Sequence, residues 1–313
     1  MQKQEKKVVI FVWYACNNHC RFCIDLNKRH INHSTKEVLN SIYDAKKSGA
    51  DTLEIIWWEV TIREDFWKIM EFIKALKFSN MYMVTNGIIF ADYEFTKKLL
   101  DLDVLKSIVF SLHGAEAKQH NFLTENPISY QAMLKWIENF HKLWFPSNRM
   151  ASNTAIEKWN YKDLLEIGKK IKELWLNGSS EFIFADPNVG WVHDNFEKLM
   201  PRISEAAPYI RDLLDWGNQN NMTYRVRYVP LCYFADYIES DNISELMEVK
   251  IYSNVTHSAP DFQNPDAVKG RQEAGRKKTA KCEWCKLYDI CEGLWTTYLD
   301  NRGDEELKKI EKI

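Results

Sequence analysis

Residues 8–23 read VVIFVWYACNNHCRFC, an apolar run followed at once by three cysteines. The run Val8–Tyr14 is rich in β-branched and aromatic residues, which predicts a buried strand. Cys16, Cys20 and Cys23 then fall within eight residues on the loop after that strand, where three thiolates can converge on a metal cluster. A zinc site and incidental thiols are the alternatives.

The pattern continues outward from this strand as alternating strand and helix segments. Apolar runs predict six strands: Val8–Tyr14, Thr52–Trp57, Met81–Thr85, Ser107–Leu112, Ala151–Ile156 and Glu181–Ala185. Amphipathic stretches predict the helices between them: Thr35–Ser48, Glu64–Leu76, Asp92–Leu102, Tyr130–Leu143 and Lys162–Leu174. Such repeats form right-handed βαβ units with a parallel sheet. The sequence therefore predicts an α/β fold, a partial (β/α)6 TIM-type barrel, with ligand sites at the carboxyl ends of its strands.

The regular repeat ends near residue 190. The segment 191–241 predicts a helix, Asn195–Met222, and one more strand, Thr223–Val229, both packing on the barrel. Residues Asn242–Arg276 are polar and loop-like, and a charged helix is expected at Asp304–Ile313. We therefore divide the chain into a core barrel at 1–190, the packing segment at 191–241, and a small Cys-rich C-terminal extension at 242–313.

Composition and charge narrow the class of protein. Of the 313 residues, 45% are hydrophobic and 27% are charged, as in ordinary soluble proteins. The formal net charge is −2 and the pI is near 6.5, which argues against a broad electrostatic surface for nucleic acid or membranes. The charged N-terminus leads into the first strand without a small-residue cleavage site, so no signal peptide is expected. We expect a cytoplasmic, reducing location, where seven cysteines bind metal rather than pair.

The cysteine spacing carries a resemblance to a known family. Cys16-x3-Cys20-x2-Cys23 after the first strand of a strand–helix repeat, with the aromatic Phe22 before the third cysteine, resembles the radical S-adenosylmethionine (radical SAM) superfamily over about residues 7–186. The resemblance implies a 4Fe-4S cluster held by the three thiolates. It also implies that S-adenosylmethionine (SAM) chelates the fourth iron and is cleaved to a 5′-deoxyadenosyl radical, which abstracts hydrogen from the substrate.

Further positions match the same superfamily at successive strand ends. The stretch WWEVTIR, residues 57–63, aligns with the family's Gly-Gly-Glu motif, which holds the amino group of SAM. His113 and Asp186 lie on similar strand-end rims. Loop capping and turn chemistry are the alternative for each single polar residue. The cofactor contacts that the resemblance implies are Phe22, Trp57, Trp58, Glu59, Asn86, Ser111 and Asn153.

The pair Trp57–Trp58 departs from the family's glycine pair. Glycine lets a backbone approach a ligand closely and adopt positive φ, and an indole does neither. Two adjacent tryptophans at a strand end are expected to intrude into the pocket. Taken as printed, the sequence is therefore expected to bind SAM poorly.

A second group of cysteines lies in the C-terminal extension. Cys282, Cys285 and Cys291 are closely spaced, and Cys232, at the end of a predicted strand, is the one cysteine left. Four thiolates suit a second, fully ligated 4Fe-4S cluster, and a structural zinc site is the alternative. The segment resembles a shortened SPASM domain, the auxiliary-cluster extension seen in part of the superfamily. The resemblance implies a role in electron transfer or in shaping the substrate pocket.

Glycine and tryptophan counts are unusual. The chain has 11 Gly and 12 Trp, whereas average usage predicts about 22 glycines in a chain of this length. Trp144 and Trp175 follow predicted helices where a left-handed residue is expected, and Trp284 lies inside a Cys-x-x-Cys turn. We hypothesise that several of these codons, with those of Trp57 and Trp58, are UGA decoded as glycine, as some bacterial lineages do. A Trp-rich variant with a degraded cofactor site is the alternative, and Trp136, Trp159 and Trp191 are less clear.

Together these patterns predict a radical SAM enzyme that acts on a peptide or a small metabolite. A reducing partner such as a flavodoxin or ferredoxin is expected, and a membrane or nucleic-acid partner is not. Two other functions stay open. One is an RNA-modifying radical enzyme, and the other is a catalytically silent iron–sulfur or scaffold protein whose cofactor loop Trp57–Trp58 blocks.

Overall fold

A nine-stranded sheet forms the frame of the computed structural model, which describes residues 6–56, 58–238, 254–260 and 262–311. The strand order is β7-β6-β5-β4-β3-β2-β1-β8-β9, so neighbours along the chain are neighbours in the sheet from β1 to β7. The seven barrel strands are β1 Lys7–Phe11, β2 Thr52–Ile56, β3 Asn80–Thr85, β4 Ser107–Ser111, β5 Met150–Ile156, β6 Ser180–Phe184 and β7 Tyr224–Arg227. All pair in parallel, which confirms the predicted α/β partial barrel.

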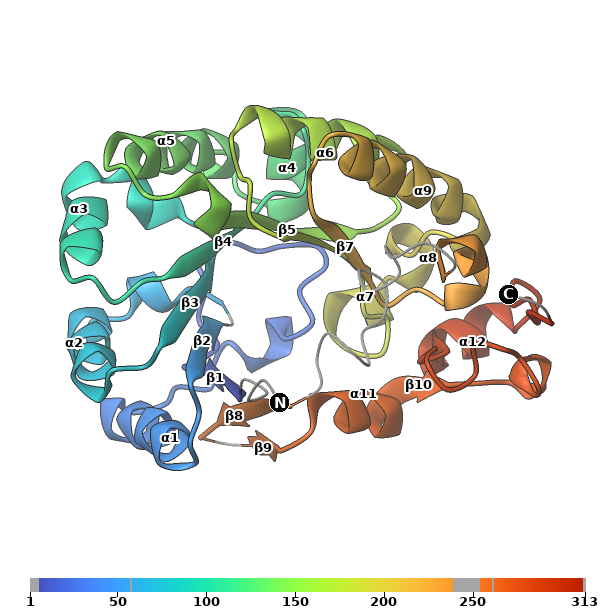
Figure 1. Cartoon of the computed structure of the whole chain (residues 1–313), viewed down its shortest axis with the longest axis horizontal. Helices are drawn as coiled ribbons and strands as arrows, with labels where there is room; N and C mark the ends of the chain where they lie inside the picture. The colour runs from blue at the N-terminus through green and yellow to red at the C-terminus, as the bar shows by residue number, and fades with distance from the viewer. Residues whose placement is uncertain (1–5, 57, 239–253, 261, 312–313) are drawn as a thin grey trace.

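Helices cover the outer face of this curved sheet (Figure 1). The helices of the repeat are α1 Thr35–Lys47, α2 Phe66–Leu76, α3 Tyr93–Asp101, α5 Ser129–Lys142 and α6 Leu164–Glu173. Each begins and ends within about two residues of its predicted bounds, and a short helix that was not predicted, α4 Ala117–Thr124, precedes α5. The start of α1 is fixed by a capping box, in which Ser34 and Glu37 each accept a backbone N–H of the other.

The hydrophobic core lies between the helices and the sheet. Met133, Ile137 and Phe140 on the inner face of α5 are buried, and the Phe140 ring meets the edge of Phe110 on β4 at 5.6 Å between centroids. Because side chains alternate along a strand, every second residue points into the barrel instead. The interior therefore receives a separate set of side chains, and many of them are polar or charged.

The segment after the barrel contains two short helices, α7 Gly190–Asp194 and α8 Phe196–Leu199, and then the long α9, Ile203–Gln219. The single helix predicted at Asn195–Met222 is thus divided, and the break falls at Met200–Arg202 around Pro201, as expected for a residue that lacks a backbone N–H. Pro208, which lacks a backbone N–H, lies inside α9, near the start of the helix.

Two predictions for the C-terminal extension are wrong. Part of the predicted loop Asn242–Arg276 forms β8 Val255–Ala259, β9 Phe262–Asn264 and α11 Ala267–Gly275, and β8 pairs in parallel with β1; residues 242–253 lie outside the described chain. The prediction missed β8 because its residues are mostly polar, although part of the strand is buried. The predicted helix at Asp304–Ile313 is absent from residues 304–311, and the helix is instead α12, Thr296–Arg302, which ends at Gly303 with φ +67°.

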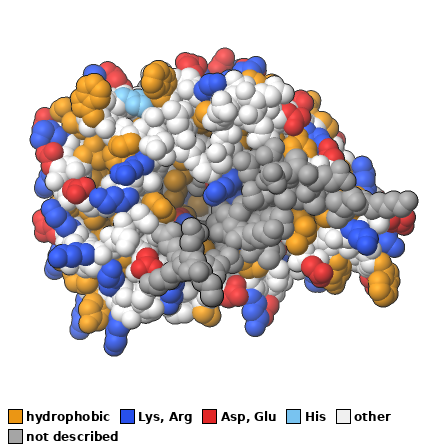
Figure 2. Space-filling view, in the orientation of Figure 1, with side chains coloured by type: hydrophobic (Ala, Val, Ile, Leu, Met, Phe, Trp, Pro, Cys, Tyr) orange, Lys and Arg blue, Asp and Glu red, His pale blue; other side chains and the backbone are white. Residues whose placement is uncertain are grey.

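Charged side chains of both signs are interspersed over the face shown in Figure 2, in keeping with a net charge of −2. No helix in the described ranges combines the length and the apolar character needed to cross a bilayer.

Candidate active site

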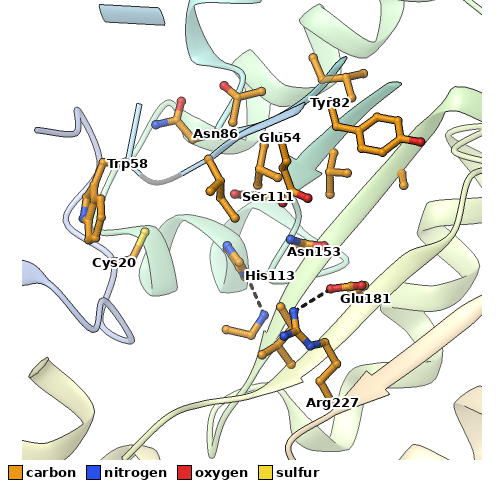
Figure 3. Close-up of a pocket in the computed structure, with 18 of the residues that line it drawn as sticks. Cys20, Glu54, Trp58, Tyr82, Asn86, Ser111, His113, Asn153, Glu181 and Arg227 are labelled. Atoms are coloured by element: carbon orange, nitrogen blue, oxygen red, sulfur yellow. Dashed lines mark hydrogen bonds and ion pairs between the residues drawn. The ribbon is translucent and has the colours of Figure 1, made fainter. Parts of the chain in front are cut away.

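A cavity of about 590 Å³ lies inside the barrel, where the cysteine loop meets the carboxyl ends of the strands. It runs from this end toward the amino ends of β4 to β7, and Figure 3 shows the side chains that project into it. Most of the side chains predicted to bind the cofactor line this one cavity, although they come from five strand ends. The predicted residues that line it are Cys16, Cys20, Phe22, Cys23, Trp58, Asn86, Ser111, His113, Asn153 and Asp186.

The cysteine loop is held against α4 by its backbone. The amides of His19 and Arg21 donate to the carbonyls of Thr124 and Leu123 at 3.0 and 2.9 Å, and that of Cys23 donates to the Cys20 carbonyl at 3.1 Å. These bonds turn the three thiols toward the cavity. The sequence predicts the thiols but gives no sign of the helix that supports them.

The three thiols form an environment that favours a bound cation. Burial and then the charge of Glu59 raise the pKa of Cys16 to about 11, and burial with the charges of Cys16 and Cys23 raises the pKa of Cys20. Thiolates are therefore costly here without a positive group, which iron supplies. The Asn18 amide and the Asn86 side chain donate to the Cys16 sulfur at 3.4 and 3.6 Å, as donors around iron–sulfur thiolates do. The residues present thus fit a cluster.

Arg29 is a site residue that the sequence analysis missed. One of its guanidinium nitrogens donates to the Asn18 carbonyl at 2.5 Å, and its Nε is buried without a hydrogen-bond partner. It lines the cavity and its charge lowers the pKa of Cys16. A buried, partly satisfied guanidinium suits an anionic ligand beside the thiols. The only signal in the sequence is its place six residues after Cys23.

Glu59 lies behind the cavity wall rather than in it. Its carboxylate accepts hydrogen bonds from the Thr61 amide and hydroxyl at 3.2 and 2.5 Å, from the Thr85 hydroxyl at 2.8 Å and from the Asn86 amide at 2.8 Å. The side chain is fully buried, and burial raises the pKa of Glu59, although these hydrogen bonds oppose the rise. Glu59 therefore joins the loop after β2 to the loop after β3, which carries Asn86.

Trp58, which precedes Glu59 in the loop after β2, has an unusual backbone conformation. Its φ is +53°, in the left-handed region that favours glycine. Its ring lies tilted against Tyr14, with 4.8 Å between centroids, and it lines the cavity beside Cys20 (Figure 3). Trp57 lies outside the described residues, so its contact with the cofactor stays a prediction.

Ser111, Asn153 and His113 bring the next two strands into the site. Ser111 and Asn153 are paired across β4 and β5 and both reach the cavity. His113 Nδ1 accepts the Ala155 amide at 3.1 Å, so the ring proton lies on Nε2. Burial, with His120 nearby, holds the pKa of His113 well below its usual value, and the ring packs on Phe22 at 4.4 Å between centroids. His113 is therefore a neutral part of the wall.

Glu157, just after β5, is a second residue that the sequence analysis missed. Its side chain is fully buried and neither carboxylate oxygen has a hydrogen-bond partner. Burial raises the pKa of Glu157 to about 8, although the charge of Arg21 opposes this. The signal in the sequence was a charged residue directly after the apolar end of the predicted strand Ala151–Ile156.

Ion pairs occupy the deep part of the cavity. Arg227 on β7 pairs with Glu181 on β6 at 3.1 Å, as Figure 3 shows, and Lys7 on β1 pairs with Glu54 on β2. The charges of Glu181 and Arg227 both act on Lys7 across the barrel. Isolated charges inside apolar strands are the signal that would have predicted this lining.

The four remaining cysteines lie close together in the C-terminal half. Burial, with the charges of Cys291, Cys282 and Cys285, raises the pKa of Cys232 to about 11, so the other three sulfurs lie close enough to act on Cys232. Amides of Leu231 and Gly293 donate to the Cys291 sulfur at 3.5 and 3.4 Å, and that of Ile310 donates to Cys285 at 3.5 Å. Across the described chain, no three His, Cys, Asp or Glu side chains stand at the spacing of ligands to a single ion.

A model of the radical SAM superfamily matches residues 10–171, more than half of the chain. The chain belongs to the radical SAM superfamily. The family implies a 4Fe-4S cluster and SAM, and it supports an enzyme of the radical SAM kind.

Curated relatives match over a shorter stretch. A probable GTP 3′,8-cyclase of Saccharolobus solfataricus is 31% identical over 107 residues, which is 34% of this chain and 34% of that protein. A probable GTP 3′,8-cyclase of Saccharolobus islandicus is 28% identical over 117 residues, or 37% of each chain. The match thus spans about a third of the length of these relatives.

Solved structures resemble the whole radical SAM chain. Streptococcus suis SuiB bound to S-adenosylmethionine has a TM-score of 0.66 at 17% identity, covering 97% of this chain and 76% of that one. The protein named anSMEcpe, solved with AdoMet and the Cp18Cys peptide, has a TM-score of 0.67 at 16% identity, covering 98% and 94%. At these identities the likeness shows the fold alone.

Proposed function

We propose that this radical SAM enzyme binds its catalytic 4Fe-4S cluster through Cys16, Cys20 and Cys23, cleaves SAM reductively, and acts on a peptide or a small metabolite. The observation that carries the proposal is the convergence of these three thiols with the ends of β2 to β6 on one cavity of about 590 Å³. When bound, the cluster and SAM supply an electron and a 5′-deoxyadenosyl radical that takes hydrogen from the substrate.

The residues of this chain then have separate tasks. The thiols hold the cluster, and Asn86 hydrogen-bonds to Cys16, which keeps the β3 loop against it. Ser111 and Asn153 offer hydrogen bonds to the carboxylate or ribose of SAM from the β4 and β5 ends. Arg29 attracts the anionic end of the ligand. Glu59, which the family resemblance gives as a cofactor contact, accepts the Asn86 amide from behind the cavity wall, and we propose that it acts by positioning the β3 loop.

We further propose that Cys232, Cys282, Cys285 and Cys291 hold a second 4Fe-4S cluster that transfers electrons or shapes the substrate site. Their shared neighbourhood and the amides donated to Cys291 and Cys285 support it. A four-cysteine cluster leaves no iron open to substrate. Zinc is the other metal that four thiolates would hold. We also propose the division of the chain at residues 190 and 241, with the C-terminal extension joined to the barrel where β8 pairs with β1.

For the substrate we favour a peptide. The structure of anSMEcpe, which covers nearly all of this chain, was solved with a peptide, and SuiB was solved with its precursor peptide SuiA. A nucleotide is the second candidate, because five Lys and Arg side chains line the cavity against three acidic ones. The relatives named probable GTP 3′,8-cyclases also have a nucleotide, GTP, in their name.

The test is anaerobic reconstitution with iron and sulfide, reduction with dithionite, and measurement of 5′-deoxyadenosine. We expect formation from SAM that the Cys16→Ala variant abolishes, and flavodoxin or ferredoxin is expected to replace dithionite. The chain as printed and a variant with glycine at positions 57 and 58 are compared, since Trp58 lines the cavity. Intact clusters without 5′-deoxyadenosine in both proteins would instead identify a catalytically silent iron–sulfur protein.

A further inference from the structure

We infer that Trp58, Trp136, Trp144, Trp175 and Trp284 are glycines in the native protein, and that Trp13, Trp67, Trp216 and Trp295 are true tryptophans. The inference is independent of the proposed function, because it concerns which residue the backbone accepts at each position. It divides the tryptophans by backbone geometry and packing. Trp159, which is half-exposed and packs on Phe122, and Trp191 are assigned to neither group, and Trp57 lies outside the described residues.

Left-handed backbone is concentrated at tryptophan. Ten non-glycine residues of the described chain have positive φ, and four of them are tryptophan, with φ from +53° to +61°. Tryptophan is 12 of 313 residues, so a proportional share would be less than one. Positive φ is uncommon for any side chain and a true outlier for a bulky one. The four are Trp58, Trp144, Trp175 and Trp284.

Helix ends supply an internal comparison. After α5, the Trp144 amide donates to the His141 carbonyl at 3.0 Å and the next amide to the Phe140 carbonyl at 3.0 Å. After α6, the Trp175 amide donates to Lys172 at 3.0 Å in the same pattern. This is the Schellman motif, whose left-handed residue is usually glycine and sometimes asparagine.

The same motif ends two other helices of this chain with the expected residue. After α1, the Gly49 amide donates to the Lys46 carbonyl at 3.0 Å, and Gly49 has φ +83°. After α9, Asn221 occupies the position with φ +56°. Trp144 and Trp175 are 91% and 66% exposed, so their indoles project into solvent at sites that call for no side chain.

Trp284 and Trp136 are anomalous in opposite surroundings. Trp284 is 87% exposed, between Cys282 and Cys285, in a turn closed by the Cys285 amide on the Cys282 carbonyl at 3.1 Å. Trp136 is fully buried on α5, where its ring centroid lies 3.1 Å from that of Phe110. Aromatic pairs prefer about 4.5–7 Å. The two rings are therefore closer than packed aromatic rings are, so the space is overfilled.

The other four tryptophans make contacts that need an indole. Trp13 donates its Nε1–H to the Glu59 carbonyl at 3.1 Å. Trp67 packs on Phe95, and the Lys98 ammonium lies 4.0 Å from its ring centroid. The buried Trp295 carries the Arg276 guanidinium at 4.3 Å, and Trp216 is stacked on a tyrosine. If the source organism reads UGA as glycine, only the tryptophans written for UGA codons would be misplaced. This explains why the unusual backbone and packing occur at some tryptophans and not at the others.

The test reads the residue directly. The codons are sequenced, and tryptic peptides of the protein from its source cells are identified by mass spectrometry. We expect UGA codons and glycine at positions 58, 136, 144, 175 and 284, and UGG codons and tryptophan at 13, 67, 216 and 295. UGG or a tryptophan-containing peptide at any of the five positions would overturn the inference, whatever the activity of the enzyme.

A recombinant comparison gives a second readout. The variant with glycine at the five positions is expected to unfold at a temperature at least about 5 °C above the chain as printed, because four left-handed sites are relieved. The matched control carries glycine at positions 13, 67 and 216 and is expected to unfold at a lower temperature, because packed indoles are lost. Equal or lower thermal stability of the five-glycine variant would contradict the assignment.

Discussion

Replacing Glu59 by glutamine tests whether this carboxylate positions the site or touches the ligand. Glutamine keeps the shape of the side chain but offers only one acceptor oxygen. In the structure, donors surround both carboxylate oxygens, with Thr61 on one, the Asn86 amide on the other, and the Thr85 hydroxyl 2.8 Å from each. Either rotamer of the new amide therefore places an NH2 group against a donor.

The magnitude follows from these bonds. A hydrogen bond to a charged group contributes about 1.5–3 kcal/mol, and at least one is lost while the others become neutral. Burial of the carboxylate costs free energy, as the raised pKa of Glu59 indicates. The neutral glutamine avoids this cost, which offsets part of the loss. We expect the Glu59→Gln apoprotein to lose about 2–4 kcal/mol of unfolding free energy, because the hydrogen-bonded join between the two loops is broken.

The assay is anaerobic urea unfolding of the apoprotein, followed by SAM binding to the reconstituted enzyme. Glu71→Gln on the exposed face of α2 is the matched control, expected to change stability by less than about 0.5 kcal/mol. Weaker SAM binding by Glu59→Gln should accompany the loss of stability, since Asn86 and Cys16 move with the loop. Unchanged apoprotein stability together with lost SAM binding would refute the positioning role and make Glu59 a direct ligand contact.

Three further predictions follow from the thiols and the buried charges. Cys282→Ala is expected to lose about four irons per chain by metal analysis while a SAM-dependent spectral change of the first cluster persists, and loss of zinc instead would contradict a second iron–sulfur cluster. Because the pKa of Glu157 is raised from 4.5 to about 8, the unfolded chain releases its proton first, so apoprotein stability should fall as pH rises between these values, by something on the order of 4 kcal/mol. Urea midpoints of Glu157→Gln should lack that component, and identical pH profiles would contradict it. Arg227→Met should destabilise the protein by about 1.5–3 kcal/mol because the charge-assisted bond between Arg227 and Glu181 is lost, and adding Glu181→Gln should recover part of the loss in the same urea assay.

The barrel strands could be predicted from the sequence because buried parallel strands are continuous apolar runs. The prediction for the first strand, Val8–Tyr14, extends past its observed end at Phe11. Val12 and Tyr14 are buried although they lie in the loop. Apolar sequence reports burial, and the hydrogen-bonded ladder ends earlier, so the run was longer than the strand.

The strand β8 could not be predicted, because its residues Val255–Ala259 include Thr256, His257 and Ser258. Its neighbours explain the exception. It pairs in parallel with β1 and antiparallel with β9, and the Gln263 side chain on β9 donates to the Ser258 hydroxyl at 2.7 Å. A polar strand of this kind depends on tertiary hydrogen bonds that no local pattern encodes.

Within the site, the metal ligands were predictable and their surroundings were not. The three thiols share one loop, so their spacing in the sequence is also their spacing in space. Arg29 follows the cysteine loop by six residues and Glu157 comes from a distant segment, and folding brings the charges of both close to Cys20. Their buried, unpartnered atoms mark them, and burial is a property of the whole fold.

The loop after β2 explains why backbone and printed residue disagree at position 58. The backbone that follows this position is held by other residues, since the Glu59 amide donates to the Ala15 carbonyl at 3.1 Å and the Glu59 carbonyl accepts from the Trp13 indole. The Glu59 side chain fixes the same loop from behind through Thr85 and Asn86. None of these bonds uses the side chain at position 58, so they hold the loop whatever residue stands there, and the φ at this position is +53°. The left-handed backbone at position 58 therefore favours glycine, although the sequence has tryptophan there.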